Sequence, residues 1–305
     1  MENNKFTFVE IDKYASERIA APHYSYWRSV ARKFFSSKVA IATLCVAGVI
    51  VLLSLIHPMI SQYNPMAKPN INDFSMRFIR PCFEFPFGTD DVGDSLFAAV
   101  WAGTRNSLLI ATIATVVTTV LGVIVGAFWG YSKKLDVIMI EVYNVIANVP
   151  FTVLITVLMY VLGRGFWQLI FALSCTSWLG TAYFIRVQVM MIRDREYNLA
   201  SRCLGTPTPR IIIHNVLPYL ISVIVTAVAR DVPSFISYEV FLSYLGIGLG
   251  ANMASLGNMV SSYATYMKST PYLFWIPVAI SATISVSLYV LGQTLADAAD
   301  PRTHM

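Results

Sequence analysis

The chain has 305 residues, of which 56% are hydrophobic and 13% are charged, and this charged share is about half of that in a typical soluble domain. A soluble fold of this length needs more charge to cover its surface, so the composition indicates that much of the surface faces lipid. The net charge of +5 therefore does not indicate a nucleic-acid partner, and the positions of the charges matter more than their sum.

Six stretches without Asp, Glu, Lys or Arg are long enough to cross a membrane as helices, which takes about 20 mostly apolar residues. The predicted fold class is an all-α membrane protein with about six transmembrane helices. We expect the fifth stretch to continue toward Tyr238. In chain order the stretches are Val39–Ile60, Asn106–Ser132, Val142–Gly163, Phe166–Ile185, Ile211–Ala229 and Thr270–Ala296.

A further uncharged stretch, Val240–Met267, is rich in Gly, Asn and Ser. Backbone groups in lipid must be satisfied within a regular helix, and this composition supports such a helix poorly. We predict a loop or a short re-entrant helix on the outer face of the membrane. A seventh span is the alternative, and it would place the C-terminus on the opposite side.

The distribution of Lys and Arg predicts the topology. With the N-terminus inside, fifteen of these residues lie in inner segments, five lie in outer segments and two lie at or within spans. Loops rich in Lys and Arg are typically cytoplasmic, so we expect both termini on the cytoplasmic side. The mixture of aromatic and basic residues in His23–Phe35 predicts a helix that lies in the inner interface before the first span.

Glycines recur every fourth residue in the second stretch, at Gly122, Gly126 and Gly130. Residues at this spacing share one face of a helix, and a face without side chains lets a neighbouring helix approach closely. We therefore predict that this face packs tightly against another helix.

The loop Met190–Arg210 is the longest inner connection in this topology. Glu196–Leu204 contains good helix formers, and Gly205 is a natural C-terminal stop for a short helix. The two prolines in Thr206–Pro209 predict a turn, because each proline restricts the residue before it. The short helix is expected to offer apolar residues to something outside the bilayer: Tyr197, Leu199, Ala200 and Leu204.

This loop resembles the "EAA" loop of binding-protein-dependent ABC importer permeases. The resemblance rests on Leu199-Ala200-Ser201-Arg202-Cys203-Leu204-Gly205 and on Leu217-Pro218, which follows the glycine at the family spacing. One departure is that Leu199 stands where the family motif usually has Glu, so the ionic contact of that Glu is not expected here. Other segments resemble the "C" subunit type of the oligopeptide and dipeptide permeases: Phe87–Phe97, Ser243–Gly248 and Asp297–Arg302.

The resemblance implies a multi-pass plasma-membrane protein with the ABC type I importer permease fold. Two permeases would form a path for peptides, two ATPase subunits would bind ATP and Mg, and a soluble extracellular protein would deliver the substrate. This chain would be neither an enzyme nor a cofactor-binding protein, and its sequence contains no Gly-x-x-x-x-Gly-Lys-Ser/Thr phosphate loop. The ATPase-coupling residues implied by the motif are Glu196, Tyr197, Leu199, Ala200, Ser201, Leu204, Gly205 and Pro218.

The expected units of the chain follow from the topology and the resemblance. An N-terminal cytoplasmic segment with the interfacial helix precedes the first span, and a long outer loop or cap precedes the permease core. The core contains five spans and the inner coupling loop 190–210. The boundaries are 1–38, 39–60, 61–102, 103–296 and, for the cytoplasmic tail, 297–305.

Ionisable and amide side chains within spans are costly, so each needs a partner or a wet cavity. Arg230 and Asp231 lie in the fifth span, and as helix neighbours they point different ways, so we do not expect a mutual pair. Either one of them faces the path and meets a charged end of a peptide, or each pairs with another helix. Glu141, Asn144 and Asn148 form one stripe, which we expect to face the bundle interior, lining a pore or bonding a neighbouring helix.

Several alternatives remain open at the level of the sequence. An ion-driven or proton-driven secondary transporter would need an intramembrane relay of carboxylates, for which Glu141 and Asp231 are the candidates. A membrane scaffold or sensor without transport would need no such relay of carboxylates. The outer segment from about Ser61 to Trp101 is either a structured cap or a plain packed loop. Peptides, nickel and other solutes share this permease type, and the second permease is either a different chain or a second copy.

Overall fold

The computed structural model describes residues 26–61, 63–67, 72–250 and 252–299. The predicted segment before residue 26 and the end of the tail after residue 299 lie outside this part. The described residues form helices without a named strand: α1 Tyr26–Ser36, α2 Lys38–Ser61, α3 Leu96–Tyr131, α4 Lys133–Ala147, α5 Phe151–Leu162, α6 Phe166–Arg193, α7 Glu196–Cys203, α8 Thr208–Ile211, α9 Leu217–Tyr244, α10 Leu256–Tyr263 and α11 Pro271–Ala299.

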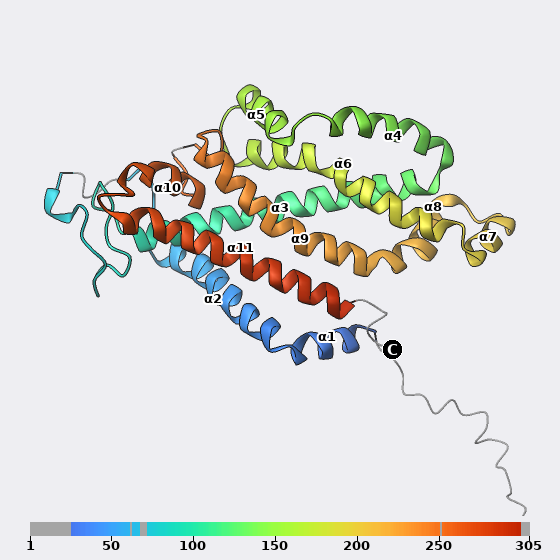
Figure 1. Ribbon diagram of the computed structural model, residues 1–305, viewed down its shortest axis with the longest axis horizontal. Coiled ribbons are helices and arrows are strands. Elements are labelled where there is room, and N and C mark those ends of the chain that lie inside the picture. The colour runs from blue at the N-terminus through green and yellow to red at the C-terminus, as the bar shows by residue number, and fades with distance from the viewer. Residues whose placement is uncertain (1–25, 62, 68–71, 251, 300–305) are drawn as a thin grey trace, which may run out of the picture.

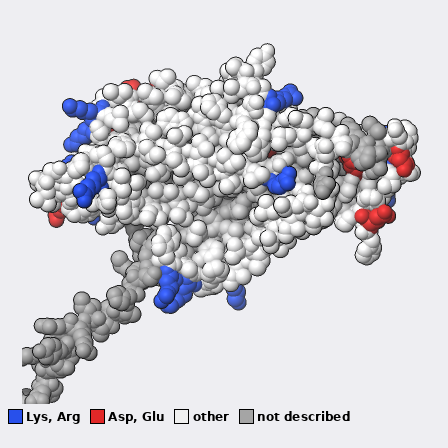
Figure 2. Space-filling model, turned by 180° about the vertical axis from the view of Figure 1, so that it is seen from behind, with Lys and Arg blue, Asp and Glu red and all other residues white. Residues whose placement is uncertain are grey.

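Long helices lie side by side along the longest axis of the molecule (Figure 1). Five helical stretches are long and apolar enough to cross a membrane, and a sixth results if α4 and α5 count as one broken span. The predicted all-α fold with about six spans is confirmed. Figure 2 shows a broad, mostly uncharged belt between the two ends of the molecule, as a lipid-facing surface requires.

The third span differs from its prediction, because Val142–Gly163 is not one straight helix. α4 ends at Ala147, α5 begins at Phe151, and the two helices are bent by 81°. Pro150 precedes α5, and a proline both lacks a backbone N–H and forces the residue before it out of the helical region. The break therefore follows from a residue that a search for uncharged stretches does not weigh.

Several other boundaries move because a charge does not end a helix; α6, for example, continues through Arg186 to Arg193. α3 begins at Leu96, within the predicted outer segment 61–102, and runs through Arg105. α9 reaches Tyr244 and includes Arg230 and Asp231 in its interior, so the predicted extension of the fifth span toward Tyr238 is confirmed.

α3 and α6 form the most closely packed pair of helices in the molecule. A Cβ added to Gly122, Gly126 or Gly130 of α3 would lie closer than 3.0 Å to atoms of α6. The predicted glycine face is therefore the contact surface between these helices. Because the backbone of α3 lies directly against Thr181, Ile185 and Val189 of α6, with no space left between them, we expect the two helices to move as one body.

α10 replaces the seventh span that was the alternative for Val240–Met267. It has eight residues, and it buries Leu256, Met259, Val260 and Tyr263 against α3, α9 and α11. Glu239 of α9 is fully buried beside it and accepts hydrogen bonds from Ser107 (2.7 Å) and Ser243 (2.9 Å). The short predicted helix is confirmed, and it is part of the core at this end of the bundle.

The predicted helix before the first span is also present, as α1. Its Val30 is buried against Ala298 and Ala299 at the end of α11. Trp27 and Phe35 are more than half exposed. This arrangement fits a helix that lies at the membrane surface, with one side on the bundle and aromatic side chains toward lipid.

Candidate functional site

α7 lies in the loop between α6 and α9, at the end of the bundle opposite α10 (Figure 1). It ends in a Schellman motif, because the N–H of Thr206 donates to the carbonyl of Ser201 and the N–H of Gly205 donates to that of Arg202. Gly205 has a φ of +78°, a conformation that glycine adopts without strain. The predicted short helix with a glycine stop is confirmed.

The residues of α7, together with its C-cap Leu204, divide into an outward and an inward set. Leu204 is 85% exposed, and Glu196, Leu199 and Ala200 are exposed beside it. Asn198, by contrast, is fully buried and donates to the carbonyl of Ile192 at the end of α6 (3.0 Å). The apolar side chains of this segment thus face away from the bundle, although a soluble protein would normally bury them.

Ser201 and Tyr197 connect α7 to the beginning of the fifth span. Ser201 accepts a hydrogen bond from the side chain of Asn215 (3.1 Å), and Tyr197 stacks on Tyr219 with ring centroids 5.8 Å apart. Burial is the main cause that raises the pKa of Tyr197. These two residues, which the motif predicts to take part in coupling, therefore also attach α7 to the fifth span.

Pro218 lies in the first turn of α9, after a π-helical turn at Ile212–Val216. A proline cannot donate a backbone hydrogen bond, so a helix that arrives from Thr208 must change its bonding pattern before this position. The wide turn lets the chain continue from α8 into α9 without ending. Pro218 thus fixes the junction between the loop that contains α7 and the fifth span.

A cavity of about 430 Å³ is lined by α5, α6 and α9. Arg230 and Asp231 are both on its wall, and the prediction that they would not pair is wrong, because Arg230 Nε lies 3.5 Å from Asp231 Oδ1. The long arginine side chain folds back along its own helix. Its side chain remains 59% exposed, whereas that of Asp231 is 14% exposed. The rest of the wall is aromatic or carries small and hydroxyl groups: Phe151, Thr176, Ser177, Gly180, Thr181, Ser234, Phe235 and Tyr238.

Glu141 and Asn144 of α4 and Asn148, which directly follows this helix, are exposed, and α4 has no buried residue. The prediction that this stripe faces the interior of the chain's own bundle is wrong. The reason is that α4 lies on the outside of the bundle, against the end of α3 and against Tyr183 and Arg186 of α6. None of the three lines the cavity that holds Arg230.

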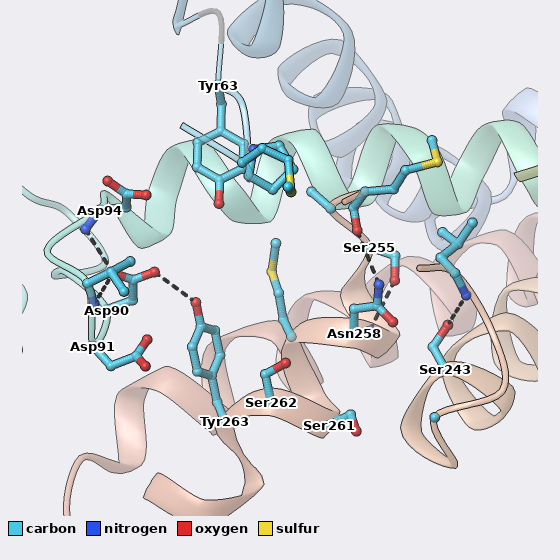
Figure 3. A pocket seen from close by; sticks show the side chains of 18 of the residues that line it. Tyr63, Asp90, Asp91, Asp94, Ser243, Ser255, Asn258, Ser261, Ser262 and Tyr263 are labelled. Atoms are coloured by element: carbon cyan, nitrogen blue, oxygen red, sulfur yellow. Dashed lines mark hydrogen bonds between the residues drawn. The ribbon is translucent and has the colours of Figure 1, made fainter. Parts of the chain in front are cut away.

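A second cavity, of about 520 Å³, lies at the α10 end of the bundle (Figure 3). Asp90, Asp91 and Asp94 form one wall, and Tyr263 of α10 donates a hydrogen bond to Asp90 (3.2 Å). Burial raises the pKa of Asp90, and backbone hydrogen bonds from Asp94 and Val92 partly oppose that shift. The loop before α3 is thereby held on α10 by a carboxylate.

The same loop is held by its own hydrogen bonds. Thr89 Oγ1 donates to the carbonyl of Met76 (2.6 Å), and the hydroxyl of Tyr272 on α11 donates to the carbonyls of Ile79 and Thr89. Within the described residues, the outer segment is therefore a folded loop packed on α10 and α11. Among these residues no group of three or more His, Cys, Asp or Glu could hold a metal ion.

The fold and the exposed short helix define a class: a multi-pass membrane protein with a helical loop that faces away from its bundle. Residues 118–305 match the family described as binding-protein-dependent transport system inner membrane component, and residues 25–81 match the N-terminal TM domain of oligopeptide transport permease C. The chain belongs to the first of these families, as an inner-membrane component of the oligopeptide and dipeptide permease type.

Full-length relatives agree with this assignment. The chain is 51% identical to the oligopeptide transport system permease protein AmiD of Streptococcus pneumoniae, with 100% of this chain and 99% of AmiD covered. It is 32% identical to OppC, the oligopeptide permease protein of Bacillus subtilis, over 94% of this chain and 93% of OppC. It is 31% identical to the dipeptide permease protein DppC of Bacillus subtilis, over 94% and 89%. The predicted resemblance is confirmed.

Proposed function

We propose that this chain forms half of a membrane path for oligopeptides or dipeptides and that ATPase subunits drive it through α7. The observation that carries the proposal is the outward set of α7, above all Leu204, which is 85% exposed. Exposed apolar residues that gather beside a glycine turn, here Leu199, Ala200 and Leu204, are typical of a surface that another protein covers. The relatives that are named peptide permeases support the substrate class.

The complete transporter contains a second homologous permease, encoded as a different chain, two ATPase subunits that bind ATP and Mg, and an extracellular substrate-binding protein. Both termini of this chain and α7 lie on the cytoplasmic side, as the excess of Lys and Arg in the inner segments favours. ATP binding closes the ATPase pair, moves α7, and changes the side of the membrane to which the path is open.

The cavity that holds Arg230 and Asp231 is this chain's share of the path. Arg230 is the group that meets the carboxylate end of a peptide, because its side chain is mostly exposed although Asp231 is beside it. The hydroxyl groups on the α6 wall suit a backbone of any sequence, since they offer hydrogen bonds without charge. The stripe Glu141, Asn144 and Asn148 faces the second permease, because lipid would leave its amides and carboxylate unsatisfied.

A secondary transporter driven by protons is the competing function. It requires carboxylates that pass a proton along one route, and Asp231 is paired with Arg230 whereas Glu141 lies on a different surface. Uptake of peptide into proteoliposomes that contain the complete complex distinguishes the two functions. We expect uptake to require ATP and to be absent with a proton gradient alone; uptake driven by the gradient through this chain alone would contradict the proposal.

The test of α7 is the purification of the complex with Leu204→Asp. We expect the ATPase subunits to be lost from the purified complex, because a buried carboxylate at the contact is strongly unfavourable. Leu245→Asp is the matched control, since Leu245 is 50% exposed at the other end of the bundle. Retention of the ATPase subunits by Leu204→Asp would contradict a docking role for α7.

A further inference from the structure

The attachment of α7 to the bundle depends on few apolar contacts. Asn198 is its only buried residue, so a force applied to α7 must reach the spans through specific side chains. The structure gives three such connections: to the end of α6, to the start of α9 and to the end of α3. The third of these is made by Arg202, a residue of α7 that the coupling motif does not single out.

Arg202 joins α7 to α3 and α6 at once. Its Nε donates to the hydroxyl of Tyr131, the last residue of α3 (2.8 Å), and its guanidinium carbon lies 4.7 Å from the centre of the same ring. Its Nη2 donates to the carbonyl of Arg193, the last residue of α6 (3.1 Å). One planar guanidinium thus holds three helix ends in a fixed geometry, which a flexible ammonium does not reproduce.

A second arginine makes the two spans a common support for this contact. Arg193 is buried, and its Nη1 donates to the carbonyl of Gly130 on α3 (2.9 Å). Asp194 lies 3.1 Å from Arg193 and 3.9 Å from Arg202, so it links the two cations. Behind this contact, α3 and α6 are packed along the glycine face. A displacement of Arg202 therefore acts on both helices together.

We infer that the arginine clamp, defined as Arg202 with Tyr131, Arg193 and Asp194, transmits the motion of α7 to the paired helices α3 and α6. Arg202 is a positioning residue in this inference, because it acts through Tyr131 and touches neither substrate nor nucleotide. The inference rests on the proposed function of α7. It goes beyond that function by separating the residues that dock a partner from the residue that passes the movement on.

Arg202→Gln in the assembled transporter tests the inference. Peptide uptake and ATP hydrolysis are measured in the same proteoliposomes. We expect the complex to assemble and to hydrolyse ATP, while the peptide transported per ATP falls about fivefold or more, in the range of typical coupling effects between sites. Arg210→Gln is the matched control, because Arg210 is an exposed arginine of the same loop; its ratio is expected to stay at the wild-type value.

Tyr131→Phe removes the acceptor hydroxyl and keeps the ring. We expect a smaller fall in the same ratio, and no further fall when Tyr131→Phe is added to Arg202→Gln, because both changes break one contact. Thermal unfolding of the purified complex shows whether Arg202→Gln folds. If it does not, Tyr131→Phe alone tests the inference. Additive losses in the double variant would contradict a shared contact.

Two outcomes overturn the inference. A wild-type ratio of transport to hydrolysis in both Arg202→Gln and Tyr131→Phe would mean that the clamp passes no motion. Loss of the ATPase subunits from an Arg202→Gln complex that is otherwise folded would mean that Arg202 docks the partner instead. The Leu204→Asp experiment is independent of both outcomes, so failure of the clamp and failure of the docking role are distinguishable.

Discussion

The two ends of the bundle each contain a helix of eight residues, α7 and α10, and the two helices are held in opposite ways. α10 buries five residues, four of them apolar or aromatic side chains, and belongs to the core. α7 buries one asparagine and exposes Leu199 and, directly after its last residue, Leu204. Two helices of equal length are thus held differently: apolar burial fixes α10 in place, whereas polar contacts hold α7 and leave its apolar side chains exposed.

This difference has a physical consequence for movement. Close packing resists displacement, because interior side chains have no space to yield. A helix held by a few directed hydrogen bonds moves as a unit and passes its motion to the residues that it contacts. α10 is therefore suited to closing one end of the bundle, and α7 to receiving a force at the other.

Truncation of one leucine at each end of the bundle is expected to give the largest difference in stability between α10 and α7. Leu256→Ala of α10 is expected to lower the free energy of unfolding by about 2–5 kcal/mol, because it leaves a cavity in a closed core. Leu204→Ala of α7 is expected to change it by less than about 0.5 kcal/mol, although it weakens retention of the ATPase subunits. The measurement is unfolding of the purified chain in mixed micelles with increasing SDS, followed by circular dichroism.

Equal destabilisation by the two truncations would remove the distinction between the ends. It would mean that Leu204 packs against the chain itself and that its exposure does not describe the protein in solution. A loss of ATPase subunits with Leu256→Ala but not with Leu204→Ala would likewise contradict the assignment of the two helices.

Glycine substitutions at the two ends test the same difference and are expected to have a somewhat smaller effect on stability. A Cβ at Gly257 of α10 would lie 2.6 Å from the Ser243 side chain and 2.8 Å from the Val240 backbone, so Gly257→Ala is expected to cost about 1–3 kcal/mol by overpacking. Gly205 has a φ of +78° and open space around it. Gly205→Ala is therefore expected to cost about 1 kcal/mol from backbone strain alone.

Substitution by asparagine distinguishes backbone strain at Gly205 from overpacking at Gly257. Asparagine tolerates the left-handed conformation better than alanine does, so Gly205→Asn should recover part of the loss in the same unfolding assay. At Gly257 the larger side chain meets the same backbone, so Gly257→Asn should be worse than Gly257→Ala. The reverse order at either position would show that the wrong cause has been assigned there.

The sequence was sufficient for most of the fold because burial in lipid leaves a strong compositional signal. Five of the six predicted spans appear as continuous helical stretches, whose ends move by more than one residue only where a charged residue such as Arg105 lies inside the helix. The break at Pro150 was visible in the sequence, but its angle depends on how α4 and α5 pack. The short helix α7 and its stop at Gly205 follow from local propensities, so both were predictable.

The candidate site was less accessible to sequence reasoning. The outward residues of α7 follow from helix periodicity and a glycine turn. The arginine clamp does not, because Arg202 and Tyr131 are 71 residues apart and meet only after α3 and α6 have packed. The prediction for the stripe Glu141, Asn144 and Asn148 was wrong for a related reason. Periodicity shows which residues share a helix face, but only the packed structure shows what that face contacts.

The last prediction, with the smallest effect, concerns the carboxyl group of Asp90, which accepts a hydrogen bond from Tyr263 of α10. Asp90 is buried beside Asp91 and Asp94, with Tyr63 and Tyr263 facing it. Burial is the largest cause that raises its pKa, so the folded state binds a proton more tightly than the unfolded state. Its contribution to stability is then fully present below the unfolded pKa and is lost as the pH rises through the folded pKa.

We therefore expect the melting temperature of the purified complex to fall from pH 4 toward pH 7 more steeply in the wild type than in Asp90→Asn, which cannot titrate. Asp73→Asn is the control of opposite sign, because hydrogen bonds from Ser75 lower the pKa of the exposed Asp73 carboxyl. A stabilising contribution from Asp73 is present above its unfolded pKa and is lost as the pH falls through its folded pKa. Parallel curves for the wild type and Asp90→Asn would mean that burial of this carboxyl does not influence how firmly the loop is held on α10.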